Sequence, residues 1–324
     1  MIKTRFTELA GVAHPVVLGG MGGGTSPELV AAVSGAGGLG VQAATGRTSE
    51  DLGRMAAAIR SQTDRPFGLN LLMFMSSDDS VEAVLAQKPA VFSTAWPRED
   101  QDLKALFARA HSAGCLVMHM VATLPDAERA AAAGADVVVA QGTEGGGHVG
   151  TIGTAVLVRM VARAVSPLPV LAAGGIADGA GLAAMLALGA EGVLLGTRFL
   201  ATPEAPIPDA FKRLIVDSDG HDTLVTDVND IALDRHWPGA WSRVKRNRFV
   251  ERWQGRANEL RRQQAEVARG LEEARKNGEV EEAVLYTGQT SGLIDEIVPA
   301  ARVVEDIVKE AEEILGGRLP GLMV

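Results

Sequence analysis

The sequence predicts an α/β fold, a TIM (β/α)8 barrel with a smaller helical insertion that caps it. Short apolar runs recur eight times, alanine-rich helical segments separate them, and each run ends in glycine or a small polar residue. Strands that are apolar throughout are typical of a parallel sheet buried on both faces. Eight such units in about 200 residues match the count of this barrel. A doubly wound sheet remains the alternative, because strand order cannot be read from the sequence.

The apolar runs define the predicted strands, and glycine, serine and proline define the helix ends. In chain order the strands cover residues 16–21, 39–44, 67–73, 90–95, 115–121, 137–142, 169–175 and 192–199. Ser26 is expected to cap the helix that follows the first strand, with Pro27 in its first turn. Gly134 is expected to end the helix before the sixth strand.

The strand rhythm stops after Thr202. Residues 203–285 are polar, and the stretch from Ser242 to Lys276 predicts one or two long charged helices. We therefore predict a barrel domain formed by residues 1–202 together with 286–324, and a helical cap formed by residues 203–285. The chain closes with an amphipathic helix whose apolar face carries Val303, Val304, Ile307, Ala311 and Ile314.

Composition narrows the class of protein. The 31 Lys and Arg against 40 Asp and Glu give a net charge of -9, which argues against nucleic acid or an anionic membrane as the main partner. A single cysteine, Cys115, allows no internal disulfide and no cysteine-based metal site, so no metal is predicted. No signal peptide or apolar stretch of about 20 residues is present, so we expect a cytoplasmic protein that binds a small diffusible molecule.

Glycines after the last two strands predict a phosphate site. In a (β/α)8 barrel the loops after the strands share one face, and the last two strands commonly hold a phosphate there. Backbone N–H groups of Gly174, Gly175, Gly196 and Thr197 are placed to bind its oxygens. The alternative is that these glycines only make turns.

Two amide side chains predict a planar ligand at the same face. Asn70 interrupts the third strand and Gln141 ends the sixth. Buried amides must be paired, so each requires a backbone partner or a ligand. An amide carries both a donor and an acceptor, which suits the edge of a heterocycle with alternating N–H and C=O groups.

His148 is the candidate base. It lies in "AQGTEGGGHVG", where neighbouring glycines remove steric bulk and let the loop fold closely over a ligand. An imidazole near neutral pH is a natural proton acceptor, although a loop histidine can also simply tie down backbone. His119, within the fifth strand, is expected to be a hydrogen-bonded core histidine; the alternative is that it lines the barrel.

These residues resemble a known family. "AQGTEGGGHVG", "VLAAGGIADGAGLAAMLALGAEGVLLGTRFLAT" and "GLN" in the third strand resemble the nitronate monooxygenase family, formerly called 2-nitropropane dioxygenases. The resemblance runs nearly end to end. It implies an FMN enzyme on a TIM barrel with a smaller second domain, in which a nitronate gives electrons to FMN and oxygen accepts them, producing a carbonyl compound and nitrite.

The resemblance also assigns roles to single residues. It implies that His148 is the catalytic base, taking the α-proton of a nitroalkane or orienting the nitronate. It implies that the FMN site comprises Gly20, Met21, Gly22, Asn70, Gln141, Gly146, Gly174, Gly175, Gly196 and Thr197. The family's usual alanine in "EAGGH" is Gly145 here, a small change beside the base.

The same motifs occur in relatives with other activities. NADH:quinone reductases and FMN-dependent enoyl-acyl-carrier-protein reductases keep the histidine, so NAD(P)H is an alternative partner to a nitronate and O2. A non-flavin barrel, such as a lyase acting on a phosphorylated metabolite, is a third alternative. Trp96 and Trp241 are expected either to wall the substrate site or to pack, and the charged cap and final helix offer surfaces for a homodimer.

Overall fold

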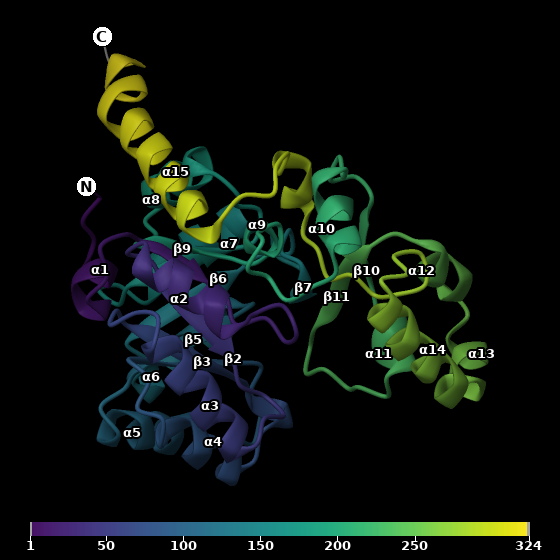
Figure 1. Cartoon of the computed structure of the whole chain (residues 1–324). Helices are drawn as coiled ribbons and strands as arrows, with labels where there is room; N and C mark the ends of the chain where they lie inside the picture. The colour runs from purple at the N-terminus through teal and green to yellow at the C-terminus, as the bar shows by residue number, and fades with distance from the viewer. Residues whose placement is uncertain (1, 323–324) are drawn as a thin grey trace.

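Within residues 2–322, which this computed structural model describes, eight parallel strands close into a barrel (Figure 1). They follow the order β1 (Val16–Leu18), β2 (Leu39–Ala43), β3 (Phe67–Leu72), β4 (Val91–Ala95), β5 (Leu116–Val121), β6 (Val137–Gln141), β8 (Val170–Ala173) and β9 (Gly192–Leu195). All eight predicted strands are confirmed, each shortened at one or both ends. The barrel closes because β1 also pairs with β9, with Val17 opposite Leu194, which excludes the doubly wound alternative.

Helices surround the barrel and bury their apolar faces on it. They are α2 (Pro27–Gly35), α3 (Ser49–Arg60), α4 (Asp78–Leu85), α5 (Leu103–Ser112), α6 (Leu124–Ala133), α7 (Thr154–Ala164), α8 (Gly179–Ala187) and the short α9 (Thr197–Leu200). The predicted helix ends are confirmed. Ser26 accepts a hydrogen bond from Leu29 N at 3.1 Å, and Gly134 ends α6 with a left-handed φ of 96°.

The barrel is closed at the end where its strands begin. There α1 (Arg5–Ala10) inserts Phe6, which is 1% exposed, among the inward-facing residues of the barrel. Thr4, which caps α1, donates a hydrogen bond to the carbonyl of Glu191, just before β9. The opposite end, where the strands finish, is therefore the end available for a site.

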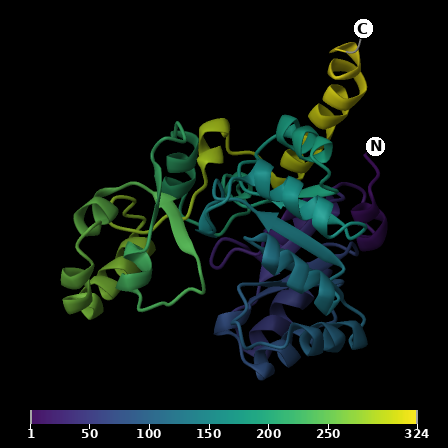
Figure 2. The same ribbon diagram turned by 180° about the vertical axis from the view of Figure 1, so that it is seen from behind.

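The cap is a second lobe beside the barrel in both views (Figures 1 and 2). It is mainly helical, as predicted, and contains α10 (Asp209–Val216), α11 (Val228–Ala232), α12 (Arg248–Trp253), α13 (Ala257–Arg262) and α14 (Gln264–Asn277). It also contains an antiparallel strand pair that was not predicted, formed by β10 (Thr223–Thr226) and β11 (Trp241–Lys245). The stretch expected to begin a long helix at Ser242 is thus strand first. The boundaries at residues 203 and 285 stay a prediction.

The cap sheet is completed by the barrel chain. A third strand, β7 (Gly147–Val149), arises from the loop between β6 and α7 and pairs antiparallel with β11. The two lobes are therefore joined by a shared sheet that holds residue 148.

The chain returns to the barrel through the 3-10 turn η2 (Gln289–Leu293) and ends in α15 (Ala300–Glu313). α15 packs against α8 and α2, and four of its five predicted apolar residues are buried, namely Val303, Val304, Ile307 and Ala311. No helix among residues 2–322 combines the length and apolar character needed to cross a membrane.

Candidate active site

The structure gathers the predicted glycines at the ends of the strands. A Cβ on Gly20 would lie 2.5 Å from the Cβ of Asn70, and one on Gly196 would lie 3.2 Å from the sulfur of Met21. These positions therefore belong to one face, and the first glycine-rich loop packs against β3 and the end of β9. Gly22 is open, since a Cβ placed there would meet no atom within 4 Å.

The loop after β8 needs its glycines for two reasons. Gly174 and Gly175 have φ values of +90° and +75°, a region that side-chain-bearing residues rarely adopt. A Cβ on Gly174 would also lie 2.8 Å from the carbonyl oxygen of Gly142 and 2.9 Å from the nitrogen of Gly145. The two loops therefore approach each other through their backbones.

Residues near the chain's end join this face. A Cβ on Gly146 would lie 2.6 Å from the nitrogen of Gly288, and that nitrogen donates to Thr197 Oγ1 at 3.0 Å. Thr287, completely buried, has a hydroxyl without a hydrogen-bond partner among the described residues. Thr287 and Gly288 were not among the predicted residues, although the glycine-rich "YTGQTSG" is a signal that could have pointed to them.

The two amides differ in how far the protein satisfies them. Asn70 Oδ1 accepts a hydrogen bond from Ser93 Oγ at 2.9 Å. Gln141 Oε1 is buried and finds no partner within residues 2–322. A buried, unpaired acceptor costs free energy, about 1–3 kcal/mol, so Gln141 is the amide that most needs a ligand.

His148 lies in the centre of β7, opposite Ser242 of β11. The preceding Gly147 has a φ of +81°, which turns the chain into this strand. The side chain of His148 is 6% exposed and lies between the two lobes. The antiparallel register explains the contact, because directly opposed residues on neighbouring strands bring their side chains within reach of each other.

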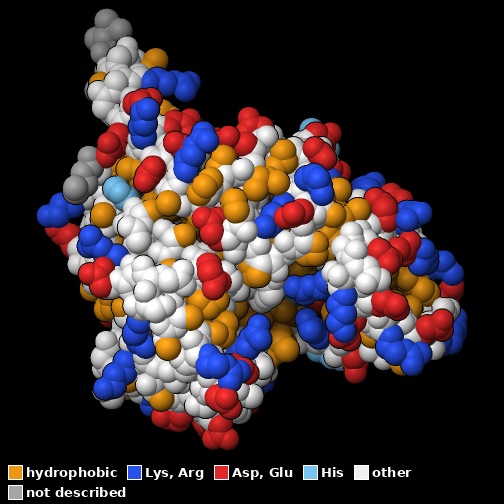
Figure 3. Space-filling view, viewed as in Figure 1, with side chains coloured by type: hydrophobic (Ala, Val, Ile, Leu, Met, Phe, Trp, Pro, Cys, Tyr) orange, Lys and Arg blue, Asp and Glu red, His pale blue; other side chains and the backbone are white. Residues whose placement is uncertain are grey.

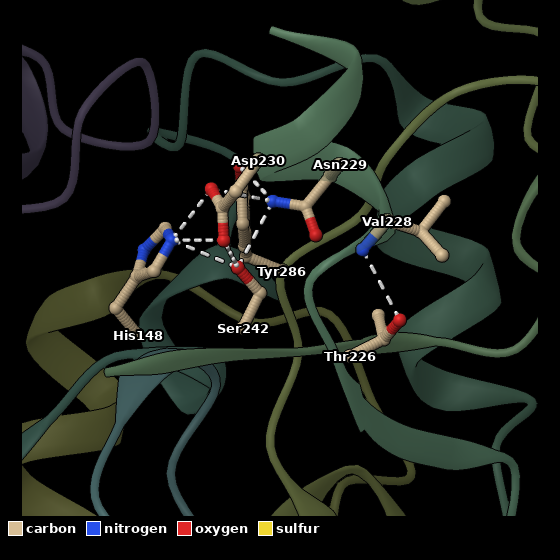
Figure 4. A network of polar contacts seen from close by, with 7 residues as sticks. All are labelled: His148, Thr226, Val228, Asn229, Asp230, Ser242 and Tyr286. Carbon is tan, nitrogen blue, oxygen red and sulfur yellow. Dashed lines mark hydrogen bonds and ion pairs between the residues drawn. The ribbon is translucent and has the colours of Figure 1, made fainter. Parts of the chain in front are cut away.

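The cap surrounds His148 with polar groups (Figure 4). Its Nε2 is 2.9 Å and 3.1 Å from the two carboxylate oxygens of Asp230, and 2.8 Å from Ser242 Oγ. Ser242 Oγ donates to Asp230 Oδ2 at 3.0 Å. Asn229 Nδ2 donates to Asp230 Oδ1 at 3.1 Å, to Ser242 Oγ at 2.9 Å and to the hydroxyl of Tyr286 at 3.1 Å.

The other ring nitrogen, Nδ1, makes no hydrogen bond with any described residue and points away from Asp230 in Figure 4. Burial lowers the pKa of His148 from its ordinary value of 6.5, while the hydrogen bond and charge of Asp230 raise it and Arg235 lowers it. Burial also raises the pKa of Tyr286, and Asp230 adds to that rise. A neutral imidazole with one free nitrogen can act as a proton acceptor.

An aromatic cluster covers one face of this imidazole. Trp237 stacks on His148 with ring centroids 3.3 Å apart and planes 11° apart. Phe74 and Trp96 contact Trp237 at centroid distances of 4.7 Å and 6.2 Å. Trp96 has a φ of +53°, an unusual conformation for a bulky residue. The indole N–H of Trp237 is buried without a partner among the described residues.

The structure places the two predicted tryptophans differently, while their role at a substrate site stays a prediction. Trp96 packs against Trp237, the residue that stacks on His148, whereas Trp241 is 44% exposed and makes no ring contact with that cluster. Trp237 was missed, because its segment of the cap carries no periodic pattern that fixes its direction.

His119 takes the core role that was expected. It is 1% exposed, its Nδ1 is 2.7 Å from Thr94 Oγ1, and its ring centroid lies 5.5 Å from that of Phe107 in α5. It therefore faces the helices outside the barrel, and the alternative that it lines the interior was wrong. Burial lowers the pKa of His119 to about 4.

Asp230, Ser242 and Asn229 were not predicted as site residues. They lie 82, 94 and 81 residues from His148, and only the pairing of β7 with the cap brings them to it. No sequence periodicity predicts that pairing.

Comparison with known proteins places the chain in a family. A family model described as nitronate monooxygenase matches residues 3–89 and 73–310. A (3aS,4S,5R,7aS)-5-hydroxy-7a-methyl-1-oxo-octahydro-1H-indene-4-carboxyl-CoA dehydrogenase of Mycobacterium tuberculosis is 33% identical, over 96% of this chain and 96% of that protein.

Two solved structures match over almost their whole length. The structure of FabK from Thermotoga maritima has a TM-score of 0.89 and 37% identity, covering 100% of both chains. A nitroalkane oxidase from Streptomyces ansochromogenes has a TM-score of 0.82 and 31% identity, covering 97% of this chain and 99% of the other. The chain belongs to the nitronate monooxygenase family and is a flavin-dependent oxidoreductase.

Proposed function

We propose that this member of the nitronate monooxygenase family uses FMN to oxidise alkyl nitronates and nitroalkanes with O2, and that His148 is its base. The observation that carries the proposal is the position of His148. His148 lies between the lobes, and its Nδ1 has no hydrogen-bond partner among the described residues. It follows Gly146 by two residues. Gly146 packs against Gly288, whose nitrogen donates to Thr197 Oγ1.

The residues at the barrel mouth fit FMN. Buried Gln141 Oε1 lacks a partner among the described residues and suits a donor on the edge of the ring system, with Asn70 beside it. The backbone-lined loops around Gly174, Gly175, Gly196 and Thr197 suit a phosphate, and Gly20, Met21, Gly22 and Gly146 would line the remainder. When bound there, FMN would supply the redox chemistry, taking electrons from the substrate and passing them to O2.

The protein's own part is acid–base chemistry and positioning. A nitro group acidifies the neighbouring C–H, and Nδ1 of His148 takes that proton, leaving the electron pair on the substrate as a nitronate. With a preformed nitronate, the same imidazole only orients the substrate. Trp237 covers one face of this imidazole, and Phe74 and Trp96 pack against Trp237.

The surface suits an anionic substrate despite the net negative charge. Figure 3 shows a recess between the lobes, with hydrophobic side chains inside it and Lys and Arg around it. Arg275 of α14 bridges the lobes by donating to the carbonyl of Gly23 at 3.3 Å. A positive rim raises the local concentration of an anion such as a nitronate.

Anaerobic mixing tests the proposal. The purified protein is mixed separately with propyl 2-nitronate, NADH and NADPH, and the absorbance of the bound flavin is followed. We expect the nitronate to bleach the flavin and air to restore it with release of nitrite. Bleaching by NADH or NADPH alone would refute the nitronate assignment.

A second candidate is an FMN-dependent NAD(P)H oxidoreductase acting on an acyl thioester. The similarity to FabK at 37% identity over the full chain favours it, as does the similarity to the CoA-thioester dehydrogenase. The same anaerobic experiment separates the two candidates, because only this one requires reduction of the flavin by a nicotinamide.

A further inference from the structure

We infer that two cap residues, Asp230 and Ser242, hold the imidazole of His148 with its proton on Nε2, so that Nδ1 is the atom that takes the substrate proton. Both are positioning residues, since they act through His148. The catalytic part of this inference rests on the proposed function, whereas the tautomer of His148 can be measured without it.

The distances identify the protonated nitrogen. Nε2 lies 2.9 Å and 3.1 Å from the two oxygens of Asp230. A lone pair facing two carboxylate oxygens so closely would be repelled, whereas an N–H group donates to them. A neutral imidazole carries one N–H, so Nδ1 retains the lone pair.

Ser242 supports the same tautomer. Its hydroxyl has one proton, which is directed to Asp230 Oδ2 at 3.0 Å. Its oxygen also accepts from Asn229 Nδ2 at 2.9 Å. Ser242 Oγ, 2.8 Å from His148 Nε2, therefore faces that nitrogen as an acceptor. Asp230 receives donors from His148, Asn229 and Ser242, which fixes the direction of its carboxylate.

The cap fold sets these positions. Ser242 lies directly opposite His148 in the β11–β7 ladder. The turn into α11, which carries Asp230, is fixed by Thr226 Oγ1 accepting from Val228 N at 3.2 Å (Figure 4). The barrel chain supplies the base, and the cap supplies its orientation.

The proton transfer balances in this geometry. The substrate C–H bond breaks, its electron pair stays on the substrate and delocalises onto the nitro group, and the proton binds Nδ1. The imidazolium then carries two N–H groups, and the one on Nε2 already donates to Asp230. The carboxylate stabilises the charge that the transfer creates.

The groups around His148 define the expected pH dependence. Neither neighbour in β7, Gly147 or Val149, carries a charge. From the cap, Asp230 raises the pKa of His148, and Arg235 and burial lower it. Tyr286 lies 5.8 Å away between ring centroids. Removing the charge of Asp230 leaves only the lowering influences, so the pKa of His148 falls.

The first test is the pH profile of Asp230→Asn with a neutral nitroalkane. The base must be unprotonated, so kcat/KM rises with pH through the pKa of His148. We expect the variant's midpoint to move to lower pH and its plateau to fall roughly 10²-fold, because an amide no longer enforces the tautomer. Turnover of preformed nitronate should fall much less, and KM should change less than kcat.

Asp227→Asn is the matched control. Asp227 is an exposed acid three residues earlier whose side chain does not cap α11, and this variant should keep the wild-type profile. Ser242→Ala should lower the plateau by a smaller factor without removing the charge. An Asp230→Asn profile with wild-type plateau and midpoint would overturn the inference.

The second test reads the tautomer directly. ¹⁵N spectra of histidine-labelled holoenzyme, with His148 assigned by its loss in His148→Asn, should show protonated Nε2 and unprotonated Nδ1. The opposite tautomer would overturn the inference even if Asp230→Asn is slow or poorly folded. If the wild-type protein turns over no nitroalkane, the proposed function is wrong. The spectrum then still shows whether Asp230 and Ser242 hold His148 with its proton on Nε2.

Discussion

The barrel wall and the sheet shared by the two lobes each contain a buried histidine, and the two histidines have different neighbours. His119 lies in β5, faces Phe107 of α5 and contacts the neutral hydroxyl of Thr94. His148 lies in β7 and contacts the carboxylate of Asp230. Burial lowers the pKa of both, but only His148 has a neighbour that raises it again. The difference teaches that the partner, rather than burial, separates a structural imidazole from a proton acceptor.

The strongest test of this contrast is His148→Asn. We expect turnover of a neutral nitroalkane to fall roughly 10²-fold or more, the usual span for loss of a general base. FMN should stay bound, and turnover of preformed nitronate should fall less. Steady-state rates with both substrates check this, and equal wild-type rates for both would remove His148 from the base role.

His119→Gln tests the other side of the contrast. With a pKa of about 4 when folded and 6.5 when unfolded, wild-type His119 takes up a proton on unfolding between those values. The free energy of unfolding should therefore fall as the pH drops from 6.5 to 4. The expected decrease is about 3 kcal/mol, since each unit of pKa difference corresponds to about 1.4 kcal/mol. Glutamine keeps a hydrogen bond to Thr94 without titrating, so urea unfolding at several pH values should show a shallower decline. An unchanged decline would contradict the assignment.

Gly174→Ala tests whether the barrel face depends on backbone shape. Its φ of +90° and the 2.8 Å approach to the carbonyl of Gly142 leave no room for a methyl group. We expect a loss of about 1–2 kcal/mol from the left-handed backbone alone and a protein that retains less FMN. Thermal unfolding and flavin absorbance measure both effects.

Gly270→Ala is the control for this change. Gly270 lies inside α14 and a Cβ there would meet no atom within 4 Å, so alanine should be neutral or stabilise the helix by up to about 1 kcal/mol. Equal FMN content in the two alanine variants would argue against a cofactor site at Gly174.

Trp237→Leu should have the smallest effect. Loss of the stack on His148 removes about 0.5–1.5 kcal/mol of aromatic contact and leaves the imidazole less firmly held, so we expect KM to rise by at most roughly 10-fold. Trp241→Leu, at an exposed position of β11, should leave KM unchanged. If both substitutions change KM equally, the aromatic wall is not part of the substrate site.

The barrel could be predicted because the residues of each strand and helix indicate that element by themselves. Each strand is buried on both faces and is therefore apolar throughout. The runs "VVVA" in β6 and "GVLL" in β9 can be recognised as strands without knowing which strands they pair with. Glycine clusters likewise mark the strand ends, and the glycines around His148 singled it out from the other five histidines.

The cap residues around His148 could not be predicted because they depend on strand pairing between segments far apart in the sequence. Strand β11 reads "WSRVK", with two charges in five residues, and strand β7 has only three residues. Both are strands because they pair with each other, not because of their own composition. Asp230 and Trp237 acquire their neighbours only through that pairing, so no spacing in the sequence reveals them.

The most direct measurement of the central claim is the isotope effect on anaerobic flavin reduction by a nitroalkane carrying deuterium at the carbon next to the nitro group. If Nδ1 of His148 takes that hydrogen as a proton, the wild-type protein shows a primary effect with the nitroalkane and none with its preformed nitronate. Equal reduction rates for the protonated and deuterated nitroalkane, with the rate still dependent on His148, would contradict it.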